Sequence, residues 1–413
     1  MRLVNNAETL LKRNVHEFGM HIALFVKEAK TLLKRNVREY GMYIALIVIM
    51  LIFTFTTDGL FMSSRNISNL INQTGYIAVL AVGMTLVLII KQIDLSVGFV
   101  AGFLGAVAAI LLTKLDIPVF ITIPVILILG ILVGSFNGFL IAKLNIPAFI
   151  VSLAGMQIFK GALLWGTEGT GTIIVDNEIF NAIGNEYIPD IVQIEGIHLL
   201  TLVFGVAAIG LYIWSQIKTR KSNIKYHFEV TSISIFIIKI IFISVIISYI
   251  AWILAGYNGL SWTVVIVLIV VAIYHFITTK TVLGRQIYAV GSNSEAAQLS
   301  GINVKKIMFL VFCSMSMLAA LSGILFTSRL QSATTTAGNA FELDAIAAAY
   351  VGGVSAAGGV GKVTGSIIGA LVMSSLTSGM NLMGVGISYQ YIVRGAVLIA
   401  AVVFDVTTRN RRK

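Results

Sequence analysis

Long apolar stretches alternate with short polar segments along most of the chain. A helix needs about 20 apolar residues to cross the roughly 30 Å hydrocarbon core of a bilayer. Stretches long enough for this lie near 41–57, 75–91, 94–113, 118–142, 146–166, 197–217, 233–255, 259–278, 307–326, 344–361, 363–383 and 387–405. The pattern predicts an all-α polytopic membrane protein, a helical bundle of about twelve transmembrane spans. The stretch 344–361 is the weakest, because it is rich in Ala and Gly and also fits a re-entrant segment.

The distribution of basic residues favours an even number of spans with both termini in the cytoplasm. Most of the 29 Lys and Arg residues then lie in inner segments. The exceptions are Arg65, Lys114 and Arg329 in outer segments and Lys160, Lys239 and Arg394 within spans. The chain thus divides into a basic cytoplasmic segment 1–40, a transmembrane domain 41–405 and a basic cytoplasmic tail 406–413. The net charge of +11 reflects this topology and contact with anionic membrane lipid, not nucleic acid.

Composition narrows the class of protein further. With 57% hydrophobic and 11% charged residues, no soluble globular class fits. The single Cys313 excludes an intramolecular disulfide, and the His, Cys and carboxylate residues lack metal-ligand spacing. The stretch AAGGVGKVT at 356–364 has Ala356 and Val363 where a phosphate-binding loop needs Gly and Ser or Thr. We therefore expect no nucleotide site, no cofactor, no metal and no catalytic residues.

The basic N-terminal segment contains a duplication. LLKRNVHEFGMHIAL from Leu10 returns as LLKRNVREYGMYIAL from Leu32, and the second copy leads into the first span. In the first copy an apolar stripe runs beside basic residues, which is typical of an amphipathic helix on the inner leaflet. A local duplication without a function of its own explains the repeat equally well. No pattern of a cleavable signal peptide is present.

The polar stretch GSNSEAAQLSGINVKK, residues 291–306, predicts a short helix on the cytoplasmic side. Ser292 and Glu295 have the spacing of a capping box. Gly301 suits the left-handed residue that ends a helix, and Ile302 can fold back on the last turn. The helix would have about eight residues and be stable only when packed against something. It is either a stiff connector on its own protein or a docking element for a partner.

Polar side chains inside apolar runs are costly, about 2.5–3.5 kcal/mol for a central charge, so each needs a reason. Asp94 lies at an inner span boundary, where its carboxylate can cap the next helix and Ser96 can allow close packing. Four neutral residues are expected to be buried, in a translocation path or as interhelical hydrogen-bonding groups. They are Asn137, Gln157, Asn381 and Gln390.

A second polar group lies nearer the outer surface. Asn69 and Gln73 share one helical face with Asn66 and suit the hydroxyl groups of a sugar, although helix capping explains them nearly as well. Glu342 and Asp344 lie near a span end. The outer loop 167–196 has six carboxylates and no Lys or Arg, so it is either a solvated face or a docking rim for a soluble protein. These carboxylates are Glu168, Asp176, Glu178, Glu186, Asp190 and Glu195.

Five stretches resemble the permease subunits of bacterial monosaccharide ABC importers, the ribose, xylose and galactose group. They are TTDGLFMSSRNISNLINQT, LAVGMTLVLIIKQIDLSVG, IYAVGSNSEAAQLSGINVKKI, AGNAFELDAIAAAYVGGVSAAGGVGKVTGSIIGALVMSSLTSGMNLMGV and YQYIVRGAVLIAAVVFD. They follow the family's order and cover the chain from about residue 41 to its end. The first stretch and the long insertion near 197–255 are most similar to D-xylose permeases.

The resemblance implies a ten-span core with 197–255 as an inserted hairpin, in the bacterial cytoplasmic membrane. It implies a homodimer, a cytoplasmic ATPase with two nucleotide-binding halves, and an extracytoplasmic sugar-binding protein. The cargo would be a monosaccharide, D-xylose or a related sugar, and the chain a transport subunit, not an enzyme. Residues 292–302 resemble the coupling helix that docks on the ATPase. Its contact residues would be Ser292, Glu295, Ala296, Ala297, Leu299, Ser300, Gly301 and Ile302.

An ion-coupled secondary sugar transporter is the main alternative. Such a protein needs an ion-binding or titratable group deep in a span, often beside a broken helix. Asp94, Glu342 and Asp344 all lie near predicted span ends, which argues against it. A structural membrane protein is a third possibility, but it would not need a capped cytoplasmic helix.

Overall fold

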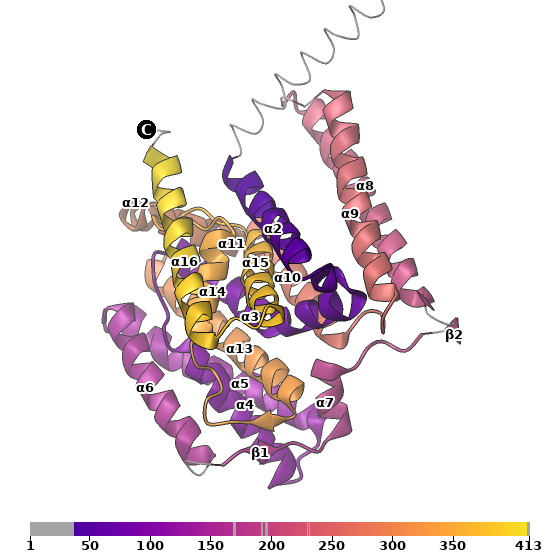
Figure 1. Ribbon diagram of the computed structural model, residues 1–413. Coiled ribbons are helices and arrows are strands. Elements are labelled where there is room, and N and C mark those ends of the chain that lie inside the picture. The colour runs from indigo at the N-terminus through magenta and orange to yellow at the C-terminus, as the bar shows by residue number, and fades with distance from the viewer. Residues whose placement is uncertain are drawn as a thin grey trace, which may run out of the picture. The chain divides into compact units, whose positions relative to one another are not determined.

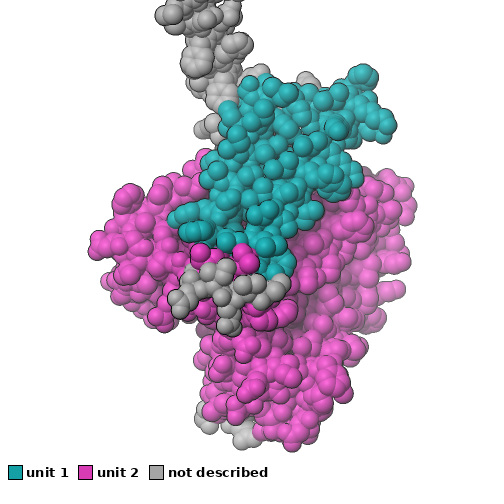
Figure 2. Space-filling model, turned by 90° about the vertical axis from the view of Figure 1, so that its right-hand side faces the viewer, with its two compact units in different colours: residues 1–41, 200–252 teal, residues 42–199, 253–413 magenta. Residues whose placement is uncertain are grey.

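The computed structural model describes residues 37–167, 171–190, 193–194, 197–228, 230 and 232–410. The first copy of the N-terminal duplication lies outside these residues. The described chain is mostly helical (Figure 1). It separates into two compact units, one of residues 1–41 and 200–252 and one of residues 42–199 and 253–413 (Figure 2).

The helices follow one another with short connections. They are α2 (Val37–Thr56), the 3-10 turn η1 (Leu60–Met62), α3 (Ser64–Ile89), α4 (Val97–Thr113), α5 (Val119–Ala142), α6 (Ala148–Gly166), α7 (Glu178–Asn185), α8 (Leu199–Lys225), α9 (Ile233–Ala255), α10 (Trp262–Lys280), α11 (Val282–Ser292), α12 (Ser294–Leu299), α13 (Val304–Leu330), α14 (Phe341–Val351), α15 (Val363–Leu382) and α16 (Ile387–Asn410). Two antiparallel pairs of short strands complete the fold. They are β1 (Ile173–Ile174) with β4 (Ser332–Ala333), and β2 (Gln193–Ile194) with β3 (Ile197–His198).

The predicted polytopic membrane architecture is confirmed at the level of apolar helices. Among the described residues, nine helices are long and apolar enough to cross a membrane. Two shorter apolar helices cover Gly41–Thr56 and Val97–Thr113. Every predicted stretch except 344–361 therefore corresponds to a long apolar helix or to one of these two.

The stretch 344–361, the weakest of the predicted spans, does not form one continuous spanning helix. α14 ends at Val351 after 11 residues, which is about 16 Å and roughly half the hydrocarbon thickness. Gly353 follows with a φ of 88°, a left-handed backbone through which a helix does not continue. Apolar composition alone did not reveal this end, because the residues beyond it are also small and apolar.

The chain around α14 nevertheless connects the two ends of the larger unit. Before α14, Ser332 of β4 is opposite Ile174 of β1. After α14, the Gly359 N–H donates to the Ile89 carbonyl at the end of α3 at 2.8 Å. Figure 1 shows β1 at one end of this unit and α12 at the other. The segment is therefore a crossing of which only part is helical.

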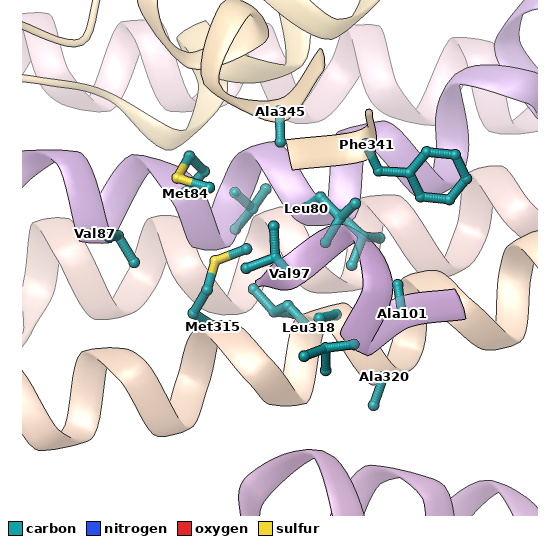
Figure 3. Packing of buried hydrophobic residues seen from close by; sticks show 14 of the residues in the cluster. Leu80, Met84, Val87, Val97, Ala101, Met315, Leu318, Ala320, Phe341 and Ala345 are labelled. Atoms are coloured by element: carbon teal, nitrogen blue, oxygen red, sulfur yellow. The ribbon is translucent and has the colours of Figure 1, made fainter. Parts of the chain in front are cut away.

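α3 is the central helix of the larger unit, and 83% of its most apolar stretch is buried. α10, α13, α14 and α15 pack around it. Leu80 and Met84 of α3 contribute to one apolar cluster with Met315 and Leu318 of α13 (Figure 3). Small residues allow such close packing: a Cβ atom on Gly323 of α13 would collide with the backbone of α4.

The other unit contains most of α8 and α9, which lie where the inserted hairpin was predicted. The most apolar stretch of α9 has no buried residue. The ends of the insertion are joined within the larger unit, where the Ile188 N–H donates to the Leu260 carbonyl at 2.9 Å and Tyr187 pairs with Ser261. The chain thus leaves and re-enters the larger unit at one place.

Candidate functional site

α12 lies where the short cytoplasmic helix was predicted, but it begins later and has six residues. Asn293 is its N-cap, since the Asn293 Oδ1 accepts the N–H groups of Glu295 and Ala296, each at 3.0 Å. Ser292 instead ends α11, and its hydroxyl donates to the Tyr288 carbonyl at 2.8 Å. The predicted capping box is therefore wrong. The extended backbone of Asn293 separates the two helices and moves the cap one residue along.

The end of α12 has the predicted geometry. Gly301 has a φ of 83°, and its N–H donates to the Gln298 carbonyl at 3.0 Å. The Ile302 N–H donates to the Ala297 carbonyl, also at 3.0 Å, which completes a Schellman motif. Ala297 is buried and the Ile302 side chain packs on the main apolar cluster. These two side chains anchor α12 to the bundle.

The other predicted coupling residues face away from the chain. Glu295, Ala296, Ser300 and Leu299 are exposed, and Leu299 is 90% exposed. α12 lies at the same end of the larger unit as the C-terminus of α16, opposite α7 and β1 (Figure 1). A short helix that is anchored only near its end, by Ala297 and Ile302, and presents the exposed side chain of Leu299 fits a docking element better than a connector.

A cleft of about 660 Å³ opens beside α12. Its walls come from α12, the start of α13 and the connection between α5 and α6. The polar residues that line it are Gln92, Asn145, Ser294, Glu295, Gln298, Asn303 and Lys305. A partner that docks on α12 would meet this cleft, with its polar and apolar walls, as part of the same surface.

The start of α12 is tied to the end of α3. The Lys91 Nζ donates to the Ser292 carbonyl at 3.1 Å. The N–H of Gly359 donates to the Ile89 carbonyl, and Gly359 packs against Ser292 with a φ of 71°. A side chain at position 359 would clash with Ser292, so only glycine allows these three segments to meet.

Gly359 belongs to the glycine-rich loop, residues 352–362, which has two more anchors. The Tyr288 hydroxyl of α11 donates to the Gly361 carbonyl at 2.7 Å. The Asp405 carboxylate of α16 accepts the Ser355 hydroxyl at 3.2 Å and the Ala356 N–H at 3.1 Å. The loop therefore links the helix before α12 with α14, α3 and α16.

Asp94 lies just before α4 but does not cap it as predicted, because the N-cap residue is Ser96 and Asp94 binds Ser96 itself. Its Oδ1 accepts the Ser96 N–H at 2.9 Å and the Ser96 hydroxyl at 2.6 Å. The Asn137 amide of α5 donates to the Ser96 hydroxyl at 3.4 Å. Asp94, Ser96 and Asn137 are all buried, and a Cβ atom on Gly155 of α6 would touch Ser96. The three predicted residues thus form one buried polar cluster.

This cluster lies deeper than predicted. Val97, the first residue of α4, packs with Met315 and Leu318 of α13 (Figure 3), and Met315 lies about 16 Å along α13 at 1.5 Å per residue. The prediction of Asp94 at a span boundary is therefore wrong. Residues 90–96 run back into the bundle without forming a helix, and hydropathy missed this because Ile93 and Leu95 prolong the apolar pattern.

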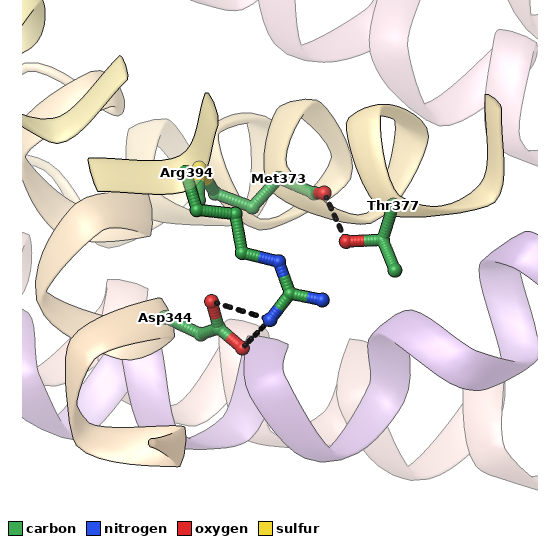
Figure 4. A network of polar contacts seen from close by, with 4 residues as sticks. All are labelled: Asp344, Met373, Thr377 and Arg394. Carbon is green, nitrogen blue, oxygen red and sulfur yellow. Dashed lines mark hydrogen bonds and ion pairs between the residues drawn. The ribbon is translucent and has the colours of Figure 1, made fainter. Parts of the chain in front are cut away.

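Glu342 and Asp344 lie in the first turn of α14, inside the larger unit. Glu342 is 6% exposed, and its Oε2 has no hydrogen-bond partner in the described part of the chain. Asp344 forms an ion pair with Arg394 of α16 at 3.3 Å (Figure 4). Arg394 was not predicted as a site residue. The signal was present, because a cation inside an apolar run needs an acidic partner.

Asn69 and Gln73 share one face of α3, as predicted. The Asn69 amide oxygen accepts a hydrogen bond from the Arg329 guanidinium of α13 at 3.4 Å. Gln73 is exposed. On the same face, Asn66 accepts from the Ser378 hydroxyl of α15 at 3.1 Å and donates to the Phe61 carbonyl.

The remaining neutral candidates separate into two kinds. Gln390 is buried as predicted, and its amide donates to the Asn381 side chain at 2.7 Å and to the Val385 carbonyl at 2.9 Å. These contacts join the end of α15 to the start of α16. Asn381 itself and Gln157 of α6 are exposed, so their predicted burial is wrong. Hydropathy identifies an apolar run but not which of its faces is covered.

The acidic outer loop is only partly described, since Glu168 and Glu195 lie outside the described residues. Asp176, Glu178 and Glu186 lie at or beside α7. Asp190 accepts the Leu199 N–H and lies 3.7 Å from His198. Asp190 thus closes the turn that contains β2 and β3.

Comparison with known protein sequences places the chain in a family. Residues 66–402 match the family described as branched-chain amino acid transport system / permease component. The chain is similar to the xylose transport system permease protein XylH of Escherichia coli strain K12, with 41% identity over 88% of this chain and 91% of the relative. It is 39% identical to XylH of Haemophilus influenzae, over 89% of this chain and 95% of the relative.

A ribose relative is somewhat more distant. The ribose import permease protein RbsC of Haemophilus influenzae is 36% identical over 84% of this chain and 86% of its own length. No solved structure matches the chain. The predicted resemblance to sugar importer permeases, with the xylose proteins ahead of the ribose proteins, is confirmed. The family match covers most of the sequence, and the chain belongs to the branched-chain amino acid transport system / permease component family.

Proposed function

We propose that this chain is the membrane-spanning permease subunit of an ATP-driven importer for a monosaccharide, D-xylose or a related sugar. The observation that carries the proposal is α12, a capped helix that presents Leu299 and Glu295 at one end of the larger unit. A transport subunit without a nucleotide site of its own needs such a surface to receive work from an ATPase. The XylH and RbsC relatives favour a sugar as cargo.

The partners follow from this function. A cytoplasmic ATPase with two nucleotide-binding halves would dock on α12 and the adjacent cleft, one half on each copy of a homodimer. An extracytoplasmic binding protein would deliver the sugar at the end that carries α7 and β1. The glycine-rich loop, which resembled a phosphate-binding motif, instead binds Ile89, Tyr288 and Asp405 of its own chain, which supports a packing role.

ATP would act by biasing two states of the bundle. Closure of the ATPase moves α12, and an equilibrium shifts only as far as the ATPase discriminates the two states. The contacts of Ser292 with Lys91 and Gly359 give this movement a route to α3 and α14. α14 carries Asp344 at its other end, where Arg394 of α16 is bound.

The ion-coupled alternative has to be judged without the span-end argument. Asp94 and Glu342 are buried beside the discontinuous helices α4 and α14, which is the arrangement that ion sites in secondary transporters use. The relatives favour the importer, since XylH is named as the permease protein of a transport system and RbsC as an import permease protein. The two functions differ in their energy source.

Uptake of D-xylose into proteoliposomes separates the two functions. The chain is reconstituted with the ATPase and binding protein that copurify with it. We expect uptake with ATP and a loaded binding protein, and no effect of dissipating proton and sodium gradients. Uptake by the chain alone, driven by either gradient, would overturn the proposal.

A further inference from the structure

The outer half of α3 carries polar side chains that its own fold leaves unused. Asn69, Gln73 and Tyr76 lie on one face of the helix, since steps of four and three residues return to nearly the same direction. Gln73 is exposed, and Asn69 and Tyr76 are partly exposed. In the described part of the chain, neither the Gln73 amide nor the Tyr76 hydroxyl has a hydrogen-bond partner. We call these three residues the α3 polar face.

Aromatic rings close the inner end of this face. The Tyr76 ring lies 5.1 Å from the ring of Phe326 on α13 and 4.8 Å from the ring of Phe341 on α14. Phe326 and Phe341 are themselves 4.8 Å apart, edge to face. Three rings from three helices thus form a continuous aromatic floor. Just inward of it lie the buried carboxylate of Glu342 and the start of α4.

Charged groups flank the same face. The Arg329 guanidinium of α13 binds Asn69 on one side. The ion pair of Asp344 and Arg394 lies one turn along α14 from Phe341, and the Arg394 Nε has no partner in the described part of the chain. Two guanidinium groups and a carboxylate therefore lie around the aromatic floor.

Lipid is a poor neighbour for this surface. The exposed surfaces of α5 and α6 have the apolar composition that suits lipid, since Phe120, Ile128, Leu132, Phe136 and Phe149 are exposed there. An amide with both its donor and its acceptor groups unpaired is costly in hydrocarbon, because no water replaces the missing hydrogen bonds. Unlike the single exposed amide of Gln157 on α6, the α3 polar face groups three polar side chains with the guanidinium groups of Arg329 and Arg394, so it borders water or a polar occupant.

We propose that the α3 polar face and its aromatic floor form an outer subsite for the transported sugar, a deepening that rests on the proposed function. Amide, phenol and guanidinium groups can exchange hydrogen bonds with sugar hydroxyls. Aromatic rings can pack against the apolar C–H face of a pyranose. The floor of Tyr76, Phe326 and Phe341 would also close the path beneath the sugar until the helices separate.

Few polar groups of the α3 polar face and its flanking residues lack a protein partner, which suits a site that binds the sugar weakly and briefly during transport. Asn69 and Arg394 already have protein partners, and only the Gln73 amide and the Tyr76 hydroxyl are wholly available. The sugar would gain two or three hydrogen bonds and lose water contacts, so its residence is brief. Selectivity then remains with the binding protein that delivers it.

Transport kinetics test the subsite. Gln73→Leu removes the free amide from an exposed position, and Tyr76→Phe removes the hydroxyl while keeping the ring. For each we expect D-xylose uptake to fall about fivefold, the size of one lost hydrogen bond, while the binding protein still stimulates ATP hydrolysis. Gln157→Leu, an exposed amide on α6, is the matched control and should transport normally.

Unchanged uptake by Gln73→Leu and Tyr76→Phe would overturn the subsite and leave the proposed function standing. A parallel loss of stimulated ATP hydrolysis would mean that the face docks the binding protein, which also overturns the subsite. Failure of the wild-type chain to import D-xylose or D-ribose in the same vesicles would instead reject the proposed function.

Cysteine labelling identifies what covers the face. In a Cys313→Ser background, Gln73→Cys should react with a membrane-impermeant thiol reagent from the outer side, and D-xylose-loaded binding protein with ATP should slow the reaction. Absence of labelling under all conditions would contradict the proposal. Spontaneous cross-linking of two copies through position 73 would show a protomer interface and contradict it as well.

Discussion

α3 and α9 are both long apolar helices, but they have opposite surroundings. Of the most apolar stretch, 83% is buried in α3 and none in α9. α3 carries glycine at 75 and 83, where other helices contact it, and polar residues such as Asn72 and Thr85. α9 is the more apolar helix and consists mainly of Ile with aromatic residues.

The difference teaches that hydrophobicity does not mark the core of this protein. In water, the most apolar helix would be the most buried, because burial removes apolar area from water. Lipid is as apolar as leucine, so a bundle in a membrane gains from close packing and internal hydrogen bonds. The central helix is therefore the one with small and polar side chains.

The largest expected effect is on the stability of the fold. It is tested by replacing glycine with alanine once in the bundle around α3 and once in the region of α8 and α9. Gly323→Ala in α13 places a Cβ atom against the backbone of Ala101, which should lower the free energy of unfolding by about 1–3 kcal/mol. Gly210→Ala in α8 meets no atom within 4 Å and should leave stability unchanged or raise it by up to about 1 kcal/mol. Thermal unfolding in detergent measures both. Equal losses at the two sites would break the comparison.

The next effect is on coupling. Gly301→Val forces a branched residue into a left-handed backbone, so we expect transport to fall about tenfold, an effect of roughly 1.4 kcal/mol. The ATPase should remain bound but weakly stimulated. Gly59, with a φ of 84° and open space around it, is the matched control between α2 and α3. Normal transport by Gly301→Val, or equal loss in Gly59→Val, would remove the coupling assignment.

A smaller effect is expected when the region of α8 and α9 is removed. The hydrogen bond of Ile188 with Leu260 already joins its ends, so a deletion that joins residue 196 to residue 258 should insert, dimerise and bind its ATPase. Transport should be reduced by less than about tenfold. Uptake and ATPase copurification are the measurements. A deletion that assembles fully yet transports nothing would place an essential gate inside the insertion.

The smallest effect concerns the acidic outer loop. Neutralising Glu168, Asp176, Glu178, Glu186 and Glu195 should weaken binding-protein association about two- to threefold at low salt. Asp190 is kept, because it accepts the Leu199 N–H. The difference should vanish as the Debye length falls from about 10 Å at 0.1 M to about 3 Å at 1 M salt. An unchanged affinity and salt slope would show that the loop is only a solvated face.

Local signals predicted those parts of the site that depend on neighbouring residues. Gly301 and Ile302 end α12 as expected, because a Schellman motif is set by a few consecutive residues. The alignment of Asn69 with Gln73 on one face of α3 was also predicted, since helix periodicity alone sets it, but Tyr76 was not. The start of α12 was placed one residue too early, because Ser292 and Asn293 are both residue types that cap helices well.

Features that depend on distant contacts were missed. Asp344 and Arg394 are 50 positions apart in the sequence and meet only through packing of α14 on α16. The exposure of Gln157 depends on which face of α6 is covered. The depth of Asp94 depends on residues 90–96 returning into the bundle, which an apolar pattern cannot distinguish from the start of a helix.

The glycine-rich loop has a consequence for energy efficiency. If the proposed function holds, the ATPase hydrolyses ATP without sugar transport whenever it moves α12 and α14 does not follow. The loop's bonds to Ile89 and Tyr288 use its own backbone groups, so they do not depend on the rotamer of a loop side chain. The connection between α12 and α14 is therefore rigid, and a movement of one helix is passed to the other. The number of ATP molecules hydrolysed per sugar transported then depends on the glycine-rich loop, although this loop contacts neither the nucleotide nor the sugar.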